Sequence, residues 1–283
     1  MPFQEIVLSP LVLALFGLCI GSFLNVVIHR LPLMLERGWK MESADLLGVA
    51  HEETPAITLS TPRSRCPSCG HAIAWYENIP LASWLWLRAR CSACKAPISV
   101  RYPLIEVATA LLFALVGWRF GAVPVALLWC FFCAVLVALA GIDWDTTLLP
   151  DNLTLPLLWT GVASAALGWT IPLADAVWGA IVGYLSLWSV YWLFKLTTGK
   201  EGMGFGDFKM NAAVGAFLGW KILPLVILLS SLVGLAFGAA QMFAARGRWD
   251  GGFRFHFGPY LAIAGVIALY WGEPIMRWYM YRV

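Results

Sequence analysis

The stretch Gly202-Met203-Gly204-Phe205-Gly206-Asp207-Phe208-Lys209 is a glycine-rich connection between long apolar runs, and it carries an acid near its end. Glycines such as Gly204 and Gly206 let the backbone bend and approach another chain closely, because they have no side chain. If the flanking runs cross a membrane, an ionisable group placed between them is costly, and Asp207 is then expected to have a function and a partner. The alternative interpretation is that Asp207 only caps the helix that follows it.

The composition is that of a polytopic membrane protein. Of the 283 residues, 60% are hydrophobic and 12% are charged, whereas about a quarter of the residues of a soluble domain are charged. The net charge of +3 is too small to indicate a nucleic-acid partner. The first apolar run has neither a preceding basic segment nor a small-residue cleavage site, so we expect a retained helix rather than a removed signal.

About eight apolar segments are predicted to be membrane-crossing helices of an all-α fold. Five reach the roughly 20 residues that cross a bilayer; these are 6–28, 120–142, 152–174, 176–194 and 222–245. Segments 102–118 and 256–272 are shorter. Segment 210–220 has only 11 uncharged residues, and it is expected either to cross the membrane or to form a re-entrant helix.

The positions of the basic residues orient these segments. If all eight cross, both ends of the chain lie on one side, and only four of the 19 Lys and Arg residues fall on that side: Arg119, Lys221, Arg277 and Arg282. Cytoplasmic loops carry the excess of Lys and Arg in membrane proteins. We therefore predict that loops 29–103, 143–151, 195–209 and 246–255 are cytoplasmic.

This topology brings two groups of acids to the same membrane face. Asp143, Asp145 and Asp151 follow the predicted third helix, and Asp207 precedes the sixth. Two carboxyl groups at one site cannot both ionise freely, so the pair can hold one proton and activate a water molecule. The sequence thus predicts aspartyl-protease chemistry. It contains neither the G-x-S-x-G motif of serine hydrolases nor the H-E-x-x-H motif of zincins.

Two C-x-x-C pairs lie in the largest polar segment of the chain. Cys66 and Cys69 form one pair and Cys91 and Cys94 the other, with 21 residues between the pairs. Four thiolates in two such turns suit tetrahedral zinc, and a site with four Cys ligands has no open position for a catalytic water. We therefore predict a structural zinc site that folds the loop 30–101, and a redox pair or free thiols are the alternative.

Three boundaries follow for the organisation of the chain. We expect a first transmembrane helix at 1–29, a cytoplasmic zinc-knuckle loop at 30–101, and a membrane-embedded core at 102–283. The start of the loop is acidic, and we hypothesise that it receives a basic peptide by electrostatic steering, although a solvated loop is the alternative. The acids concerned are Glu36, Glu42, Asp45, Glu52 and Glu53.

Other chemically notable residues lie within the apolar segments. Cys19, Cys130 and Cys133 are expected to be packing residues, because a buried Cys behaves as a small hydrophobic side chain. Glu106 is expected either to be functional or to reach the membrane interface.

The order of five motifs resembles one family, the type IV prepilin leader peptidase and N-methyltransferase. The motifs extend nearly from end to end of the chain: Gly21-Ser22-Phe23-Leu24-Asn25-Val26-Val27-Ile28-His29-Arg30-Leu31-Pro32, Pro62-Arg63-Ser64-Arg65-Cys66-Pro67-Ser68-Cys69, Arg101-Tyr102-Pro103-Leu104-Ile105-Glu106, the acidic stretch 143–151, and Gly204-Phe205-Gly206-Asp207-Phe208-Lys209. The resemblance implies a multi-pass enzyme of the bacterial inner membrane with its catalytic face in the cytoplasm. Such an enzyme cuts the basic leader from prepilins and pseudopilins after a glycine. It then methylates the new N-terminal amine with S-adenosylmethionine, in support of pilus biogenesis or type II secretion.

The resemblance also assigns roles to residues. It implies that Asp143 and Asp207 are the catalytic pair, with Asp145 as the alternative first acid and Asp151 as a supporting group. Lys209 is a candidate for biasing the pair through its charge, and an interfacial lysine is the alternative. The resemblance suggests that the N-terminal motif and Glu106 take part in methyl transfer, but it assigns no residue to the S-adenosylmethionine site.

Three other functions remain open from the sequence. One is a different G-x-G-D intramembrane protease, of the presenilin or preflagellin-peptidase kind. The second is a carrier or channel in which Asp143, Asp207 and Glu106 form an ion path. The third is a membrane-anchored zinc scaffold for an assembly machine. Membrane lipid is an expected partner in every case, and the oligomeric state is not predicted.

Overall fold

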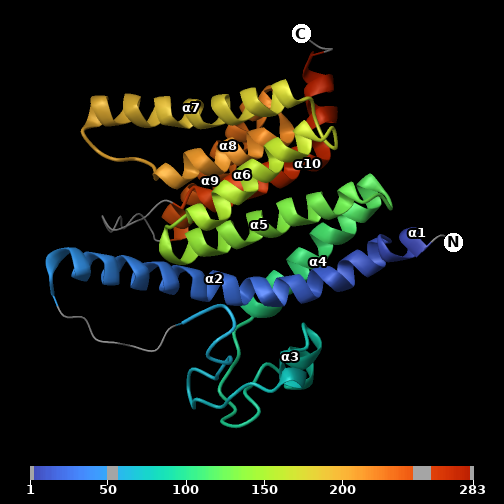
Figure 1. The fold of residues 1–283 in the computed structure, drawn as a ribbon, viewed down its shortest axis with the longest axis vertical. Coiled ribbons are helices and arrows are strands. Elements are labelled where there is room, and N and C mark those ends of the chain that lie inside the picture. Colours follow the sequence, from blue (N-terminus) through green and yellow to red (C-terminus); the bar gives the residue numbers. More distant parts are fainter. Residues whose placement is uncertain (1–2, 50–56, 245–255, 281–283) are drawn as a thin grey trace. The chain divides into compact units, whose positions relative to one another are not determined.

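The computed structural model describes residues 3–49, 57–244 and 256–280 (Figure 1). Within these ranges it contains helices and turns but no strand, and the only β pairing is two isolated bridges. The predicted all-α class is therefore confirmed. Glu52, Glu53, the predicted loop 246–255 and Arg282 lie outside the described residues. The helices are α1 (Phe3–Val7), α2 (Pro10–Leu47), η1 (Trp75–Asn78), α3 (Ala82–Trp86), α4 (Arg101–Phe120), α5 (Val125–Thr146), α6 (Asp151–Ala166), α7 (Leu173–Thr198), α8 (Phe205–Leu218), η2 (Trp220–Ile222), α9 (Leu223–Ala244) and α10 (Gly258–Met280).

Six helices within the described ranges are long and apolar enough to cross a membrane: α2, α4, α5, α7, α9 (with η2) and α10. The other two predicted segments are also helical, but α6 has 16 residues and α8 has 14. A helix rises 1.5 Å per residue, so these two are shorter than the roughly 20 residues that span the hydrocarbon core. The multi-pass architecture is confirmed, whereas the count of about eight crossings is not.

Helix α2 is longer than the sequence indicates. It begins at Pro10, where the side chain of Ser9 accepts a hydrogen bond from the Val12 N–H, and it ends at Gly48, which has a φ of 64°. Its 38 residues give a length of about 57 Å. The loop expected from residue 30 therefore begins as helix, because residues 33–47 are rich in good helix formers and Pro32 does not end the helix.

The chain forms two compact units, Met1–Ala138 and Leu139–Val283, with the boundary inside α5. In the first unit, α2 packs along α4. The contact is close because Gly21 has no side chain: a Cβ there would lie 2.6 Å from the Cα of Glu106. The apolar faces of two helices thus bring the N-terminal motif against the start of α4.

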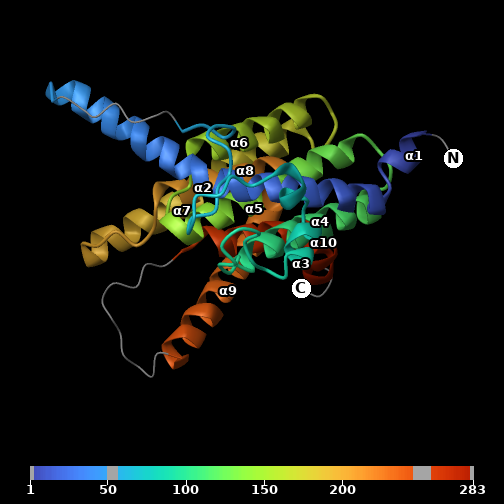
Figure 2. The same ribbon diagram turned by 90° about the horizontal axis from the view of Figure 1, so that it is seen from below.

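The polar segment of the first unit is tied to both of these helices. The guanidinium of Arg30 donates hydrogen bonds to the carbonyls of Thr58 (3.0 Å) and Pro62 (2.7 Å). The Leu81 N–H donates to Oε2 of Glu106 in α4 at 2.7 Å. In Figure 2, which is seen from below, this segment lies in front of α2 and α4.

In the second unit, α8 is surrounded by longer helices. It packs against α7, α6 and α10, and ten of its residues are buried. The buried Asn211 side chain donates a hydrogen bond of 2.8 Å to the carbonyl of Gly183 in α7. Since α8 begins at Phe205, the glycine-rich stretch leads directly into the core of this unit.

Candidate functional site

Asp207 lies at the third position of α8, and its carboxylate turns back toward the start of the helix. Its Oδ2 accepts a hydrogen bond of 3.2 Å from the N–H of Gly204, the N-cap residue. The first N–H groups of a helix have no partner within the helix, so an acid at this position satisfies one of them. Asp207 is only 6% exposed, and its Oδ1 has no hydrogen-bond partner among the described residues.

Asp143 lies in the last turn of α5 and is 5% exposed. Its Oδ2 accepts a hydrogen bond of 3.0 Å from the N–H of Gly258, the first residue of α10. The carboxylate therefore faces the unpaired N–H groups at the start of another helix, where negative charge is stabilised.

The two acids belong to the same compact unit and are near each other. The charge of Asp143 acts on Asp207, so the carboxylates of α5 and α8 interact electrostatically. Both are buried, and each is anchored through one oxygen to a backbone N–H. The structure thus brings together the two acids that the sequence places on one membrane face.

Gly206 determines how α8 meets the segment that follows α5. A Cβ at Gly206 would lie 2.5 Å from the Cβ of Leu149 and 3.2 Å from its carbonyl oxygen. Gly204 differs, because its Cβ would be 3.6 Å from Oδ2 of Asp207, which is ordinary contact. Both glycines were expected to shape the site. Only at position 206 does the close packing leave no room for a larger residue than glycine.

Lys209 and Asp145 differ from the pair of acids in their contacts and in their exposure. Nζ of Lys209 lies 2.7 Å from both carboxylate oxygens of Asp151, so its charge pairs with α6 rather than with the acids at 143 and 207. Asp145, the alternative first acid, is classed as exposed, whereas Asp143 is buried. The geometry favours Asp143 over Asp145 as the partner of Asp207.

Two aromatic side chains and a histidine border Asp143, and none of them was expected from the sequence. The ring of His256 stacks on Trp144, with centroids 5.8 Å apart and an angle of 28° between the planes. His256 and Tyr260 both interact electrostatically with Asp143. The available signal was His256-Phe257-Gly258-Pro259-Tyr260, a polar and Gly-Pro interruption at the start of the last apolar segment.

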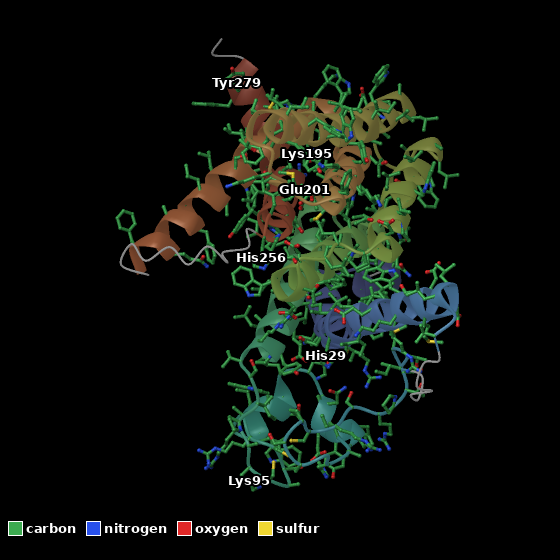
Figure 3. The ribbon with its side chains drawn as sticks, turned by 90° about the vertical axis from the view of Figure 1, so that its left-hand side faces the viewer. His29, Lys95, Lys195, Glu201, His256 and Tyr279 are labelled. Atoms are coloured by element: carbon green, nitrogen blue, oxygen red, sulfur yellow. The ribbon has the colours of Figure 1, made fainter. Side chains whose placement is uncertain are left out.

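The connection that leads to α8 is held at the end of α7. Nζ of Lys195 donates hydrogen bonds to Glu201 (2.9 Å) and to the hydroxyl of Tyr191 (3.1 Å). Figure 3 labels Lys195 and Glu201, which lie close together. The hydrogen bond from Lys195 lowers the pKa of the Glu201 carboxyl. This ion pair fixes the start of the glycine-rich stretch that carries Asp207.

The four predicted zinc ligands form one cluster in the first unit. The Sγ atoms of Cys66, Cys69, Cys91 and Cys94 all lie within 4.8 Å of one another, and those of Cys66 and Cys94 are 3.8 Å apart. A tetrahedral site with Zn–S bonds of about 2.3 Å has its sulfur atoms roughly 3.8 Å apart. The cluster could hold a zinc ion.

The two C-x-x-C turns have matching backbone hydrogen bonds. The N–H of Cys66 donates to the His71 carbonyl at 2.9 Å, and that of Cys91 donates to the Ala96 carbonyl at 2.8 Å. The N–H groups of Ser68 and Cys69 donate to the Cys66 sulfur and lower its pKa to about 6. The pKa of the Cys91 thiol is also lowered, because the N–H groups of Cys94 and Ala93 donate hydrogen bonds to its sulfur. Such turns stabilise thiolates, the form that binds metal.

A hydrogen-bond network joins the two turns to each other. Oε2 of Glu77 accepts a 2.8 Å hydrogen bond from the Ala74 N–H and lies 3.3 Å from Nε2 of His71. The same His71 nitrogen lies 3.3 Å from Oγ of Ser92. Since His71 follows the first Cys pair and Ser92 lies in the second, this network supports the cluster as partners outside a metal site commonly do.

Glu106 forms a separate polar group in the first unit. It is 7% exposed and accepts the hydrogen bond from Leu81 described above. Asn25, at the centre of the N-terminal motif, donates to the carbonyl of Tyr102 in α4 at 3.1 Å. Both contacts join segments of the first unit.

The other cysteines divide into two kinds. Cys130 and Cys133 are buried, with exposed fractions of 2% and 0%, as expected for packing residues. Cys19 is exposed, so the expectation that it packs inside the protein is wrong. In a membrane helix, the side that packs inside the protein and the side that faces lipid are both apolar. The sequence therefore did not distinguish the exposed Cys19 from the buried Cys130 and Cys133.

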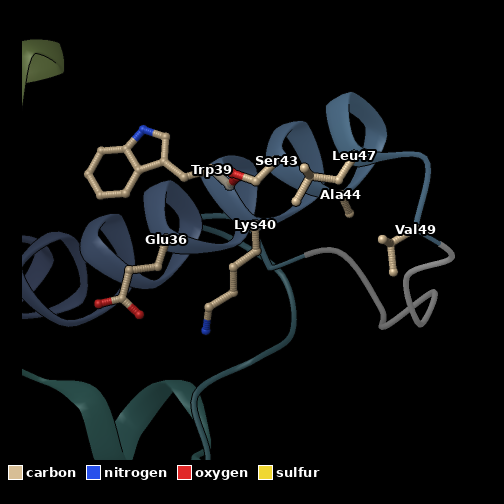
Figure 4. A pocket seen from close by; sticks show the side chains of 7 residues that line it. All are labelled: Glu36, Trp39, Lys40, Ser43, Ala44, Leu47 and Val49. Atoms are coloured by element: carbon tan, nitrogen blue, oxygen red, sulfur yellow. The ribbon is translucent and has the colours of Figure 1, made fainter.

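A shallow groove of about 460 Å³ lies at the end of α2. Figure 4 shows its seven lining residues, with Glu36 and Lys40 pointing to the same side: Glu36, Trp39, Lys40, Ser43, Ala44, Leu47 and Val49. Of the described acids in the stretch that begins the loop, only Glu36 lines this groove, and Lys40 lies beside it. The hypothesis that the acidic stretch receives a basic peptide stays a prediction.

Comparison with known proteins gives consistent matches over both units. Residues 15–120 match the bacterial peptidase A24 N-terminal domain, and residues 130–239 match the type IV leader peptidase family. A prepilin leader peptidase/N-methyltransferase of Aeromonas hydrophila is 56% identical over 94% of this chain and 92% of its own length. Proteins with the same name from Pseudomonas aeruginosa (54% identical, 94% and 91% covered) and Stutzerimonas stutzeri (51%, 99% and 98%) are similarly close.

No solved structure matches the chain significantly. The family assignment therefore depends on sequence, and both family models agree with the relatives that cover the chain nearly from end to end. This chain is a multi-pass bacterial membrane protein and belongs to the type IV leader peptidase family.

Proposed function

We propose that this protein cleaves the basic leader from type IV prepilins and pseudopilins after a glycine and then methylates the new N-terminal residue. The names of relatives that are more than half identical support both activities. The observation that carries the protease half is the pair of buried, interacting carboxylates of Asp143 and Asp207. The proposed setting is the cytoplasmic face of the inner membrane, and the proposed core is 102–283.

In the proposed cleavage, a water molecule lies between the two acids. The ionised carboxylate takes a proton from the water as its oxygen attacks the scissile carbonyl carbon, and the protonated carboxyl gives its proton to the carbonyl oxygen. The intermediate then collapses, the C–N bond breaks, and the amine leaves with a proton. Oδ1 of Asp207, which has no partner among the described residues, is free to hold this water.

The position of the acids suits the proposed substrate. Asp143 lies in the last turn of α5 and Asp207 in the first turn of α8, so both are at helix ends rather than at mid-span. A prepilin joins a water-soluble basic leader to an apolar helix, and its scissile bond lies where these meet. A site at the edge of the membrane admits both water and the apolar part of the substrate.

The methyl-transfer half is supported by the relatives' names rather than by an assigned site. S-adenosylmethionine, the proposed donor, would supply an electrophilic methyl group to the free amine. In this chain Glu106 accepts the hydrogen bond that ties the polar segment to α4, and Asn25 ties α2 to α4. We propose that these two contacts position the polar segment and the N-terminal motif for the second activity.

We propose that Cys66, Cys69, Cys91 and Cys94 bind a structural zinc ion. The separations of the Sγ atoms support this, and so do the backbone N–H groups directed at two of the sulfur atoms. Four thiolates complete a tetrahedral shell, so the ion would fold the segment and would not activate water.

The function is tested with purified protein in detergent, a prepilin precursor and S-adenosylmethionine. The expected products are a leader ending in glycine and a pilin with one added methyl group at its N-terminus, both identified by mass spectrometry. Omitting S-adenosylmethionine should remove the methyl group and leave cleavage unchanged. Failure to cut prepilins and pseudopilins alike would contradict the proposal.

A further inference from the structure

The polar segment of the first unit is strongly basic between residues 57 and 101. Its only acid is Glu77, whose side chain is 8% exposed and lies against His71. All of its six cations are classed as exposed: Arg63, Arg65, Arg88, Arg90, Lys95 and Arg101. The surface of this segment therefore favours an anionic partner.

The same segment exposes large aromatic and aliphatic side chains. Trp75 in η1 is 77% exposed, and Trp86 in α3 is 75% exposed. The two short helices pack against each other. Tyr76 in η1, Ile79 in the connection and Leu85 in α3 are also exposed. Apolar groups gathered on a basic surface are typical of a site of interaction rather than of a solvated loop.

The position of the segment identifies the partner. The bond from Leu81 to Glu106 attaches it 5 residues inside α4, a helix long and apolar enough to cross the membrane. The indole N–H of Trp84 donates to the carbonyl of Ile98 at 3.3 Å, which holds α3 to the chain that enters α4. The exposed aromatics are therefore fixed near a membrane-crossing helix.

The pictures agree with this placement. Figure 1 shows the segment to one side of α2, below it in that view, rather than beyond its end. Figure 3 shows Lys95 well away from His29 of α2. A segment that extends sideways from the axis of a membrane helix lies over the lipid that surrounds this helix.

We propose that residues 57–100 form a membrane-docking surface on which Trp75 and Trp86 enter the interface and the cations contact anionic lipid headgroups. Tryptophan rings favour the headgroup level, and basic residues near the surface are attracted to anionic lipid. A basic leader peptide would be repelled by this surface. The docking would hold the cysteine cluster at a fixed depth beside α4.

Hydrogen–deuterium exchange of the full-length protein in lipid nanodiscs tests this. One set of nanodiscs contains phosphatidylcholine alone, and the other contains one quarter phosphatidylglycerol. We expect the amides of 72–90 to exchange at least threefold more slowly with the anionic lipid at low salt. High salt should reduce this difference, because it screens exposed charges.

Two variants separate the contributions of charge and of aromatic rings. Arg63→Gln with Arg88→Gln should reduce the dependence on anionic lipid, because these are two of the six exposed cations. Trp75→Ala with Trp86→Ala should speed exchange in both kinds of nanodisc. The matched control is Trp118→Ala with Arg119→Gln at the other end of α4, where Trp118 is also 75% exposed; it should leave exchange of 72–90 unchanged.

Equal exchange of the wild-type segment in the two lipids would overturn the proposal, and this comparison needs no variant. An anionic-lipid effect in the arginine pair as large as that of the wild type would also overturn it. Metal content measured on each variant shows whether the cysteine cluster is intact. If the variant with both tryptophans replaced loses its metal, its cysteine cluster is no longer intact and its exchange is not compared. The wild-type protein in the two lipids and the arginine variant then test the proposal.

Discussion

The N–H of Gly258 donates a hydrogen bond of 3.0 Å to Oδ2 of Asp143, a residue 115 positions earlier in the chain. This bond joins the first turn of α10 to the last turn of α5. It leaves the second oxygen of the carboxylate for other contacts, and it requires that the backbone at 258 approach the acid closely.

Gly258→Ala is therefore predicted to lower prepilin cleavage at least tenfold. A Cβ at this position would lie 2.9 Å from Oδ2 of Asp143 and 3.1 Å from its Cβ, so the acid must move. The measurement is kcat/KM for leader cleavage. Gly272→Ala in the same helix is the control, because its Cβ would meet nothing closer than 3.4 Å; equal losses in both variants would contradict the steric argument.

The two glycines of the motif before Asp207 are predicted to differ. Gly206→Ala should destabilise the protein by about 1–3 kcal/mol, as overpacking does, because its Cβ would lie 2.5 Å from that of Leu149. Gly204→Ala should be much milder. Thermal unfolding in detergent and cleavage rates check both. An unfolding temperature of Gly206→Ala as high as that of Gly204→Ala would refute the contact with Leu149 as the cause.

Lys209 and Asp151 are predicted to act on stability rather than on the chemistry. Their side chains are 31% and 50% exposed, and such pairs contribute about 0.2–1 kcal/mol. Lys209→Ala and Asp151→Ala should have similar small effects that do not add in the double variant. The pH profile of cleavage should stay unchanged. A shifted profile for Lys209→Ala alone would show instead that its charge acts on the catalytic pair.

Cys66→Ser and Cys94→Ser are predicted to remove bound zinc, because three thiolates leave the tetrahedral shell incomplete. Metal content after purification is the measurement. Cys19→Ser is the control, since Cys19 lies outside the cluster. Retention of zinc by both cluster variants would contradict the assignment of the four ligands.

The features that could be predicted are those that follow from local pattern. Among the described residues, apolar run length located the long helices, and the spacing of Cys66, Cys69, Cys91 and Cys94 identified one cluster. The placement of Asp143 and Asp207 on one membrane face by loop charge stays a prediction. Run length and cysteine spacing can be read from a short stretch of sequence, and loop charge from a count of the Lys and Arg residues in each loop.

The features that were missed depend on contacts between distant segments. The partner of Lys209 is set by how α6 packs on α8, and the contact of Gly258 with Asp143 by the fold of the second unit. Helix α2 continues to Leu47 because helix formation does not stop where the apolar run ends. The count of about eight crossings is not confirmed, because α6 and α8 are apolar but have only 16 and 14 residues.

The most direct test of the central claim compares wild type with Asp143→Asn and Asp207→Asn. Each purified variant is given intact prepilin and, separately, pilin already cut, with S-adenosylmethionine present. The account predicts that both variants lose leader cleavage by several orders of magnitude while methylation of the cut pilin continues, which shows that the variants are folded. Cleavage at the wild-type rate by either variant would contradict the proposed aspartyl pair.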